Sequence, residues 1–227
     1  MSELTEKKPP SVGVVPPILL IMTGVTGIVD AVSYLALGHV FTANMTGNIV
    51  LLGFAFAGTP GLSVPRSLVA LLCFLLGAVI GGRIPIVAAP RAFAAEALLL
   101  LAAAAIALRL IAPYEQLTSA AVYGVIASTG LAMGIRNAIV RKLAVPDLTT
   151  TVLTLTITGL AADSVFAGGE NPRWKRRSAS VGALLAGAAA GALLLHRSAS
   201  LTLGIASTAT AACALVAHCR PGKDKKS

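Results

Sequence analysis

The chain has 227 residues, of which 56% are hydrophobic and 12% are charged, and its mean hydropathy is +0.85. An average soluble domain carries about 25% charged residues, so this composition excludes a soluble globular protein. The formal net charge of +9 comes from short basic segments beside apolar blocks. Such segments orient membrane helices, and without a basic and aromatic patch we expect no nucleic-acid partner.

Apolar residues gather in segments of about twenty, the length of helix that crosses roughly 30 Å of hydrocarbon. This pattern predicts an all-α fold, a polytopic transmembrane helix bundle. Two segments, 42–58 and 179–195, are at the short limit for a crossing, so we expect six to eight crossings. In chain order the eight segments are 18–37, 42–58, 66–88, 92–112, 118–140, 148–167, 179–195 and 199–218.

Both ends of the chain are predicted to be cytoplasmic. Residues 1–17 form a polar tail without a signal-peptide pattern, and residues 219–227 form a basic tail. If the eight segments alternate across the membrane, most Lys and Arg residues fall on the side of the two tails, which is the cytoplasmic side. Arg141 and Lys142 fall on the other side in this alternation.

The first segment contains a carboxylate, Asp30. A charge near the bilayer centre costs on the order of 2.5 to 3.5 kcal/mol. Thr23, Thr26 and Ser33 lie on the same helical face at spacings of three, four or seven, so this face points into the bundle. Two interpretations stay open: Asp30 is a buried hydrogen-bonding hub or half of a structural ion pair, or it belongs to an ion or substrate pathway.

The second segment opens with the polar sequence FTANMTGN at 41–48. Thr42 can cap the helix, and Asn44 and Asn48 share one face at i and i+4. A helix N-terminus at membrane depth can face an anionic or polar substrate. Alternatively, the Asn side chains hold neighbouring helices together.

Segments four and six carry further polar signals. Asp147 is predicted to cap segment six, where Thr149, Thr156 and Asp163 recur every seven residues on one face. The alternative is that the Thr hydroxyls bond back to carbonyls of their own helix. In segment four, Glu96 and Arg109 are expected near opposite ends, where long side chains reach the interface.

Two sequence matches predict an internal duplication. Residues 27–31 match 134–138 at an offset of 107, and residues 77–81 match 187–191 at an offset of 110. The predicted repeats are 18–112 and 118–218; an even number of crossings per repeat would preserve orientation and an odd number would invert it. Small residues four apart let helices approach closely in lipid, which predicts packing at Gly77, Gly81, Gly130, Gly134, Gly187 and Gly191.

The duplication aligns Asp30 with Asn137, and Arg136 is next to Asn137. We hypothesise that Arg136 either compensates the charge of Asp30 or binds an anionic group. The predicted ion or substrate pathway consists of Asp30, Asn44, Asn48, Arg136, Asn137, Thr151, Thr154 and Asp163.

The stretch GIVDAVSYLALGHVFTANMTGNIVLLG at 27–53, with residues 133–138 and 146–154, resembles the YoaK-type family of multi-pass bacterial membrane proteins. The likeness covers nearly the whole chain. The family is a domain of unknown function. The resemblance therefore implies a location in the bacterial inner membrane and supplies no activity, cofactor or catalytic residue.

Three classes of function stay open. A small-solute or ion transporter or exporter, with a polar site between the repeats, accounts for the duplication and the intramembrane charge. A non-catalytic membrane partner or regulator would need only helix faces. An enzyme is not expected because no set of His, Cys or carboxylates has a suitable spacing, and the same absence predicts no metal and no cofactor. The expected partners are the lipid bilayer and a small solute or ion, and homo-oligomer formation is left open.

Overall fold

The computed structural model describes residue 14 and residues 16–108, 119–144 and 153–220. Within these ranges the secondary structure is entirely helical. Five segments, namely α1, α3, α7, α8 and η1 with α4, are long and apolar enough to cross a membrane. The predicted all-α multi-pass class is confirmed. The elements are α1 (Pro16–Ala36), α2 (Met45–Phe56), α3 (Val64–Arg83), η1 (Ile86–Ala88), α4 (Ala89–Ala107), α5 (Ser119–Leu143), α6 (Leu153–Ala162), η4 (Val165–Ala167), α7 (Trp174–Leu195) and α8 (Ala199–Cys219).

Helix α2 and the described part of α6 are too short to cross a bilayer. α2 has 12 residues and α6 has 10, which at 1.5 Å per residue correspond to about 18 and 15 Å, whereas the hydrocarbon core is about 30 Å thick. The described part of the predicted segment 148–167 is therefore a half-length helix. Residues 145–152 lie outside the described ranges.

The predicted start of the seventh segment at residue 179 is wrong. α7 begins at Trp174 and has 22 residues, so it is a full-length crossing candidate. Its first turn includes Lys175, Arg176 and Arg177, which the hydropathy pattern had placed in a loop. A helix can continue past its apolar part into the interface because long basic side chains keep their charges in water there.

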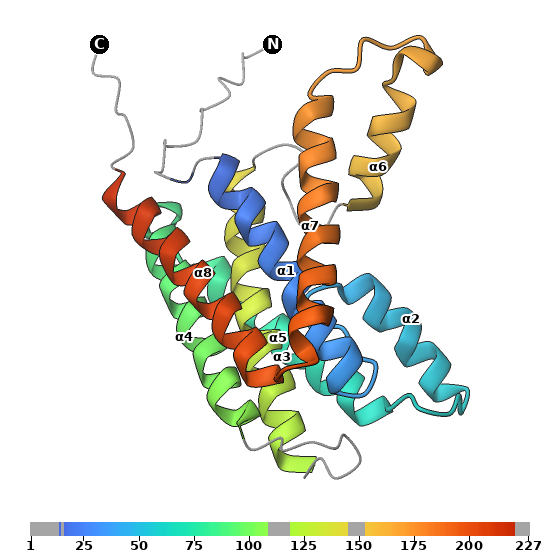
Figure 1. The fold of residues 1–227 in the computed structure, drawn as a ribbon, viewed down its shortest axis with the longest axis vertical. Helices are drawn as coiled ribbons and strands as arrows, with labels where there is room; N and C mark the ends of the chain where they lie inside the picture. Colours follow the sequence, from blue (N-terminus) through green and yellow to red (C-terminus); the bar gives the residue numbers. More distant parts are fainter. Residues whose placement is uncertain (1–13, 15, 109–118, 145–152, 221–227) are drawn as a thin grey trace, which may run out of the picture.

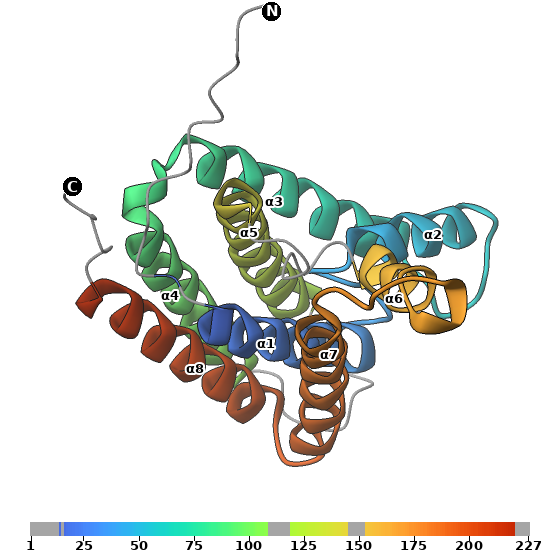
Figure 2. The ribbon, with the colours of Figure 1, turned by 90° about the horizontal axis from the view of Figure 1, so that it is seen from above.

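The long helices α1, α3, α4, α5, α7 and α8 run side by side (Figures 1 and 2). We call one end of this bundle the N-side: α1 and α4 begin there, and α3, α5 and α8 end there. Ile18 near the start of α1 shares a buried cluster with Ala89 of α4 and Ala217 of α8. Lys142 in the last turn of α5 donates from Nζ to the carbonyl oxygen of Ile84 just after α3, at 2.7 Å.

Glycines bring α1 against α7 and α3 against α5. A Cβ on Gly187 would overlap the backbone of Gly24, and a Cβ on Gly134 would overlap the carbonyl oxygen of Phe74. In each pair, a glycine further along one helix contacts a residue further along the other, so the two helices of each pair are parallel. Because α1 begins at the N-side, α7 begins there as well. Further close approaches to the partner helix occur at Gly77, Gly81, Gly130 and Gly191.

The crossing of α1 with α7 and the crossing of α3 with α5 are related by the sequence offsets of 107 and 110. Gly27 of α1 closely approaches the backbone at Leu184 of α7, and Gly134 of α5 closely approaches the backbone at Phe74 of α3. Gly134 follows Gly27 by 107 residues, and Leu184 follows Phe74 by 110. Matching helices nevertheless run in opposite directions, because α1 begins at the N-side and α5 ends there.

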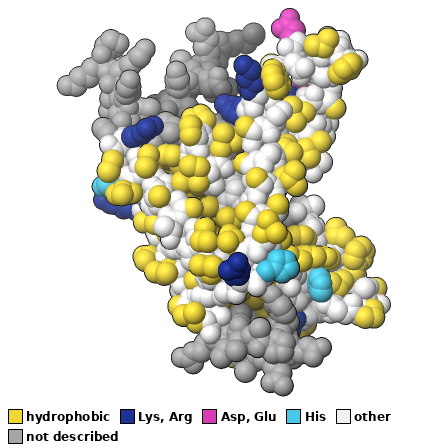
Figure 3. Space-filling view, viewed as in Figure 1, with side chains coloured by type: hydrophobic (Ala, Val, Ile, Leu, Met, Phe, Trp, Pro, Cys, Tyr) yellow, Lys and Arg dark blue, Asp and Glu magenta, His cyan; other side chains and the backbone are white. Residues whose placement is uncertain are grey.

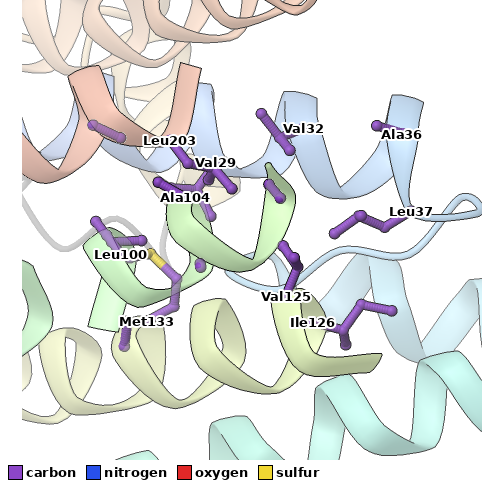
Figure 4. Close-up of a cluster of buried hydrophobic side chains, with 14 of the residues drawn as sticks. Val29, Val32, Ala36, Leu37, Leu100, Ala104, Val125, Ile126, Met133 and Leu203 are labelled. Carbon is purple, nitrogen blue, oxygen red and sulfur yellow. The ribbon is translucent and has the colours of Figure 1, made fainter. Parts of the chain in front are cut away.

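The core lies between α1, α4, α5 and α8 (Figure 4). Side chains from residues on both sides of the 112–118 boundary pack into one cluster, so the two predicted halves share this core. Its labelled members in Figure 4 are Val29, Val32, Ala36, Leu37, Leu100, Ala104, Val125, Ile126, Met133 and Leu203.

Candidate functional site

After α1 the chain turns back, so that the residues just before α2 lie beside Asp30 rather than beyond the end of α1. Asp30 lies six residues before the end of α1 at Ala36. Its Oδ1 accepts hydrogen bonds from the backbone N–H groups of Thr42, at 3.3 Å, and Ala43, at 2.9 Å. The ring of Phe41 stacks on Tyr34 of α1, with centroids 5.0 Å apart. The segment before α2 is therefore fixed against the last two turns of α1.

Asn44, rather than the predicted Thr42, caps α2. The Asn44 side chain accepts a hydrogen bond from the N–H of Gly47 at 3.3 Å. Asn48 is completely buried and donates from Nδ2 to the carbonyl oxygen of Ser67 on α3, at 3.0 Å. The structure therefore separates the two Asn residues that were predicted to act together: Asn44 faces a cavity, whereas Asn48 joins α2 to α3.

A cavity of about 460 Å³ lies where α2 and α6 begin. This volume is within the range of about 300 to 1,000 Å³ typical of small-molecule sites. α1 contributes Thr26 and Asp30 to its wall, and α6 contributes Leu153 and Thr154. The other lining residues are Ala43, Asn44, Met45, Thr46, Gly47, Phe74 and Leu184.

The electrostatics of the cavity combine the carboxylate of Asp30 with the N-terminus of α2. Among the lining residues that the structure describes, Asp30 is the charged side chain. The first N–H groups of a helix lack intrahelical partners and form the positive end of its dipole. The cavity can thus interact with polar groups of either sign. Asp30 already uses one oxygen to hold the segment before α2.

A second polar cluster lies closer to the N-side. Arg136 of α5 and Glu96 of α4 form an ion pair, and both side chains are 0% exposed. Arg136 also donates from Nη1 to the carbonyl oxygen of Met22, at 2.7 Å, and to Oγ1 of Thr26, at 2.9 Å. Since Thr26 also lines the cavity, this cluster is connected to the cavity wall.

Two sequence predictions about charge are corrected by this cluster. Arg136 pairs with Glu96, and Asp30 instead binds the backbone before α2. Glu96 does not reach the interface, because α4 begins at Ala89 and turns this side chain toward α5. Arg109, its predicted counterpart at the other end, lies outside the described residues.

The other predicted pathway residues are dispersed. Asp163 follows the C-terminal end of α6, and its Oδ2 accepts from Nη1 of Arg177 at 2.6 Å with 43% of the Asp163 side chain exposed. The Nδ2 of Asn137 donates to the carbonyl oxygen of Met133 in its own helix, at 2.8 Å. Thr154 lines the cavity, and Thr151 lies outside the described residues.

Two hydroxyl groups in α1 bond back to their own helix, which is the arrangement that the alternative interpretation described for the Thr residues of segment six. Thr23 and Thr26 donate to carbonyl oxygens four residues earlier, at 2.8 and 3.1 Å. The Thr26 hydroxyl oxygen also accepts a hydrogen bond from Arg136. Sequence reasoning missed Glu96 as a buried partner and Phe74 and Leu184 as cavity walls; the offset of 110 between the latter two was an available signal.

Fold and site define a multi-pass helical membrane protein in which two short helices, α2 and α6, line a polar cavity. A family model described as "Protein of unknown function (DUF1275)" matches residues 18–216, and the chain belongs to this family. It is 38% identical over 146 residues to the UPF0700 transmembrane protein YoaK of Bacillus subtilis (strain 168). The alignment covers 60% of this chain and 61% of that protein, less than two thirds of its length. No solved structure matches the chain.

Proposed function

We propose that this protein is a small-solute or ion transporter or exporter, and not an enzyme, with its binding site in the 460 Å³ cavity. The observation that carries the proposal is that α2 begins at this cavity, beside Asp30, and that the first described turn of α6 lines it as well. Discontinuous helices that start at membrane depth form substrate and ion sites in transporters. Irregular backbone at that depth is tolerated where it is buried in protein or lines a cavity.

The proposal includes an internal duplication with inverted halves. It is supported by the corresponding glycine crossings, α1 with α7 and α3 with α5, and by the antiparallel directions of α1 and α5. Each half then has three crossings and one half-helix. An odd number of crossings inverts the second half relative to the first, which agrees with these directions, and gives six crossings in all.

Inverted halves place the exits of the two half-helices on opposite sides. α2 leads from the cavity toward the start of α3, opposite the N-side. α6 leads toward the start of α7, where Arg177 contacts the carbonyl oxygen of Gly159 at 2.7 Å. Rocking of one half against the other would open the cavity to one side at a time, the alternating access of inverted-repeat transporters.

We further propose that the N-side is cytoplasmic. Short segments there carry most of the described basic side chains, as the positive-inside rule requires. Arg141 and Lys142, on the wrong side of an eight-crossing alternation, fall on this side in a six-crossing topology. Arg66 and Arg197 lie at the opposite end. The N-side residues are Arg83, Arg91, Arg141, Lys142, Arg173, Lys175, Arg176, Arg177 and Arg220.

The test is a thermal-shift screen of the purified protein in detergent, followed by flux into liposomes. The probes are alkali-metal and ammonium cations, inorganic anions, amino acids and a pH series. A ligand of the folded state raises the apparent stability by mass action. Asp30→Asn is compared with Asp163→Asn, because both remove one carboxylate charge from the chain but only Asp30 lines the cavity.

We expect at least one probe to stabilise the natural protein and Asp163→Asn but not Asp30→Asn. Flux of that probe into liposomes should likewise be retained in Asp163→Asn and lost in Asp30→Asn. The proposal fails if no probe in the screen raises the melting temperature of the natural protein or of Asp163→Asn. It also fails if flux is equal in protein-containing and empty liposomes. A probe that stabilises all three proteins equally would place its site away from Asp30 and would also contradict the proposal.

A further inference from the structure

An apolar groove runs along the outer surface between α4 and α8. It encloses about 440 Å³. Its floor contains the small buried residues Ala97, Ser207 and Ala214, and its walls include Leu98, Leu101 and Leu215, each more than half exposed. Ser207 donates to the carbonyl oxygen of Ala97 at 2.8 Å, so the floor has no free hydroxyl donor. Lipid acyl chains match this chemistry.

The groove extends from the N-side to about the middle of the bundle. Arg91 is near the start of α4, and Leu101 is ten residues further along the same helix. At 1.5 Å per residue this corresponds to about 15 Å, which is half of a hydrocarbon core of about 30 Å. The groove therefore has the length of one membrane leaflet.

Two polar side chains stand at the N-side mouth of the groove. Arg91 from α4 and His218 from the last turn of α8 are both exposed lining residues. A histidine and basic side chains lie together in Figure 3 near the end of α8. A guanidinium and an imidazole N–H suit a phosphate group, and basic pockets between helices on the cytoplasmic side bind anionic lipid headgroups.

At the opposite end of the same helix pair, the two positions equivalent to the residues at the mouth carry apolar side chains. Leu201 lies in the first turn of α8 and Leu108 directly follows α4. These positions correspond to Arg91 and His218 at the offset of 110, and their side chains are 49% and 69% exposed. The two residues at the mouth, Arg91 and His218, are therefore not repeated at these equivalent positions.

We propose that the groove between α4 and α8 binds an anionic phospholipid of the leaflet at the N-side. One acyl chain occupies the channel over Ala97, Ser207 and Ala214, and the headgroup phosphate contacts Arg91 and His218. This site is separate from the cavity beside Asp30, so the proposal does not depend on transport activity.

The test is native mass spectrometry of the full-length protein, delipidated in detergent and titrated with dioleoyl phosphatidylglycerol or dioleoyl phosphatidylcholine. The variants are Arg91→Gln at the mouth and Ala211→Trp, which fills the channel without changing charge. The matched control is Arg83→Gln, an exposed arginine on the same side that does not line the groove. Thermal unfolding checks that each variant is folded.

We expect the natural protein and Arg83→Gln to retain phosphatidylglycerol in preference to phosphatidylcholine. One basic residue near an anionic headgroup is worth about fivefold in affinity, so Arg91→Gln should lower the preference by about that factor. Ala211→Trp should lower retention of both lipids.

Three results would overturn the proposal. The first is equal retention of the two lipids by the natural protein. The second is an equal loss in Arg91→Gln and Arg83→Gln, which would indicate general surface charge. The third is a dimer mass that Ala211→Trp abolishes, because the groove would then be an interface between two copies of the chain.

Discussion

Arg136 of α5 and Glu96 of α4 form an ion pair in which both side chains are completely buried. Hydrogen bonds from Arg136 to α1 and α8, at Met22, Thr26 and Thr210, join this pair to two further helices. The pair connects four helices near the N-side. Removing one partner would leave the other charge buried and uncompensated.

Arg136→Gln and Glu96→Gln should each lower the free energy of unfolding by about 3 to 5 kcal/mol. The double variant should lose less than the sum, because neither charge is then left alone. An SDS titration of the purified variants measures this. As a control, Asp30→Asn combined with Arg136→Gln should be additive within about 0.5 kcal/mol. If the losses in unfolding free energy of Arg136→Gln and Glu96→Gln add up in the double variant, the ion pair is contradicted.

Asp30→Ala should destabilise the protein more than Asp30→Asn. The Asn side chain keeps an oxygen that accepts from the N–H groups of Thr42 and Ala43, whereas Ala leaves both donors without this acceptor. A buried donor without a partner costs about 1 to 3 kcal/mol. Unfolding of the two variants in detergent gives the comparison. Equal stabilities would mean that Asp30 does not hold the segment before α2.

Gly187→Ala should destabilise the protein by about 1 to 3 kcal/mol, the cost of overpacking a close contact. A Cβ there would overlap the backbone of α1 at Gly24. Gly182→Ala in the same helix is the control, because no atom lies within 4 Å of its added Cβ; this change should stabilise the helix by up to about 1 kcal/mol. The same SDS titration measures both. A similar effect of the two substitutions would argue against the glycine crossing.

Cysteine labelling should distinguish six crossings from eight. The background replaces Cys73, Cys213 and Cys219 by Ala, and single cysteines are introduced as Thr59→Cys and Val87→Cys, both at exposed positions. With six crossings and a cytoplasmic N-side, a membrane-impermeant maleimide labels residue 59 in intact cells and residue 87 only after permeabilisation. An eight-crossing alternation with the same orientation predicts the reverse.

Asp163→Asn should cost less than about 1 kcal/mol, the usual value for an exposed ion pair. Asp163 is 43% exposed in its pair with Arg177 and lies at the end of α6 away from the cavity. Chemical unfolding of this variant checks the value. A loss as large as that of Arg136→Gln would show that the α6–α7 contact is more important than its exposure indicates.

The sequence by itself determined the class of the protein and most of its helices. Long apolar segments can be read directly because each must satisfy its backbone hydrogen bonds within one helix and span a fixed thickness of lipid. Asp30 and Thr154 were also found as candidates from their polarity within such segments. Both line the cavity. Asn44 was found from its position before an apolar block.

Only the tertiary structure decided which of these polar residues meet. The expected pairing of Arg136 with Asp30 assumed that the two halves run in the same direction. Because α1 and α5 are antiparallel, Arg136 lies seven residues from the N-side end of α5, and Glu96 lies seven residues from the N-side end of α4. Asp30 is fourteen residues from the start of α1, about 10 Å deeper. The depth of a residue in the membrane depends on the direction of its helix. The spacing of residues along the sequence does not show whether two helices are parallel or antiparallel.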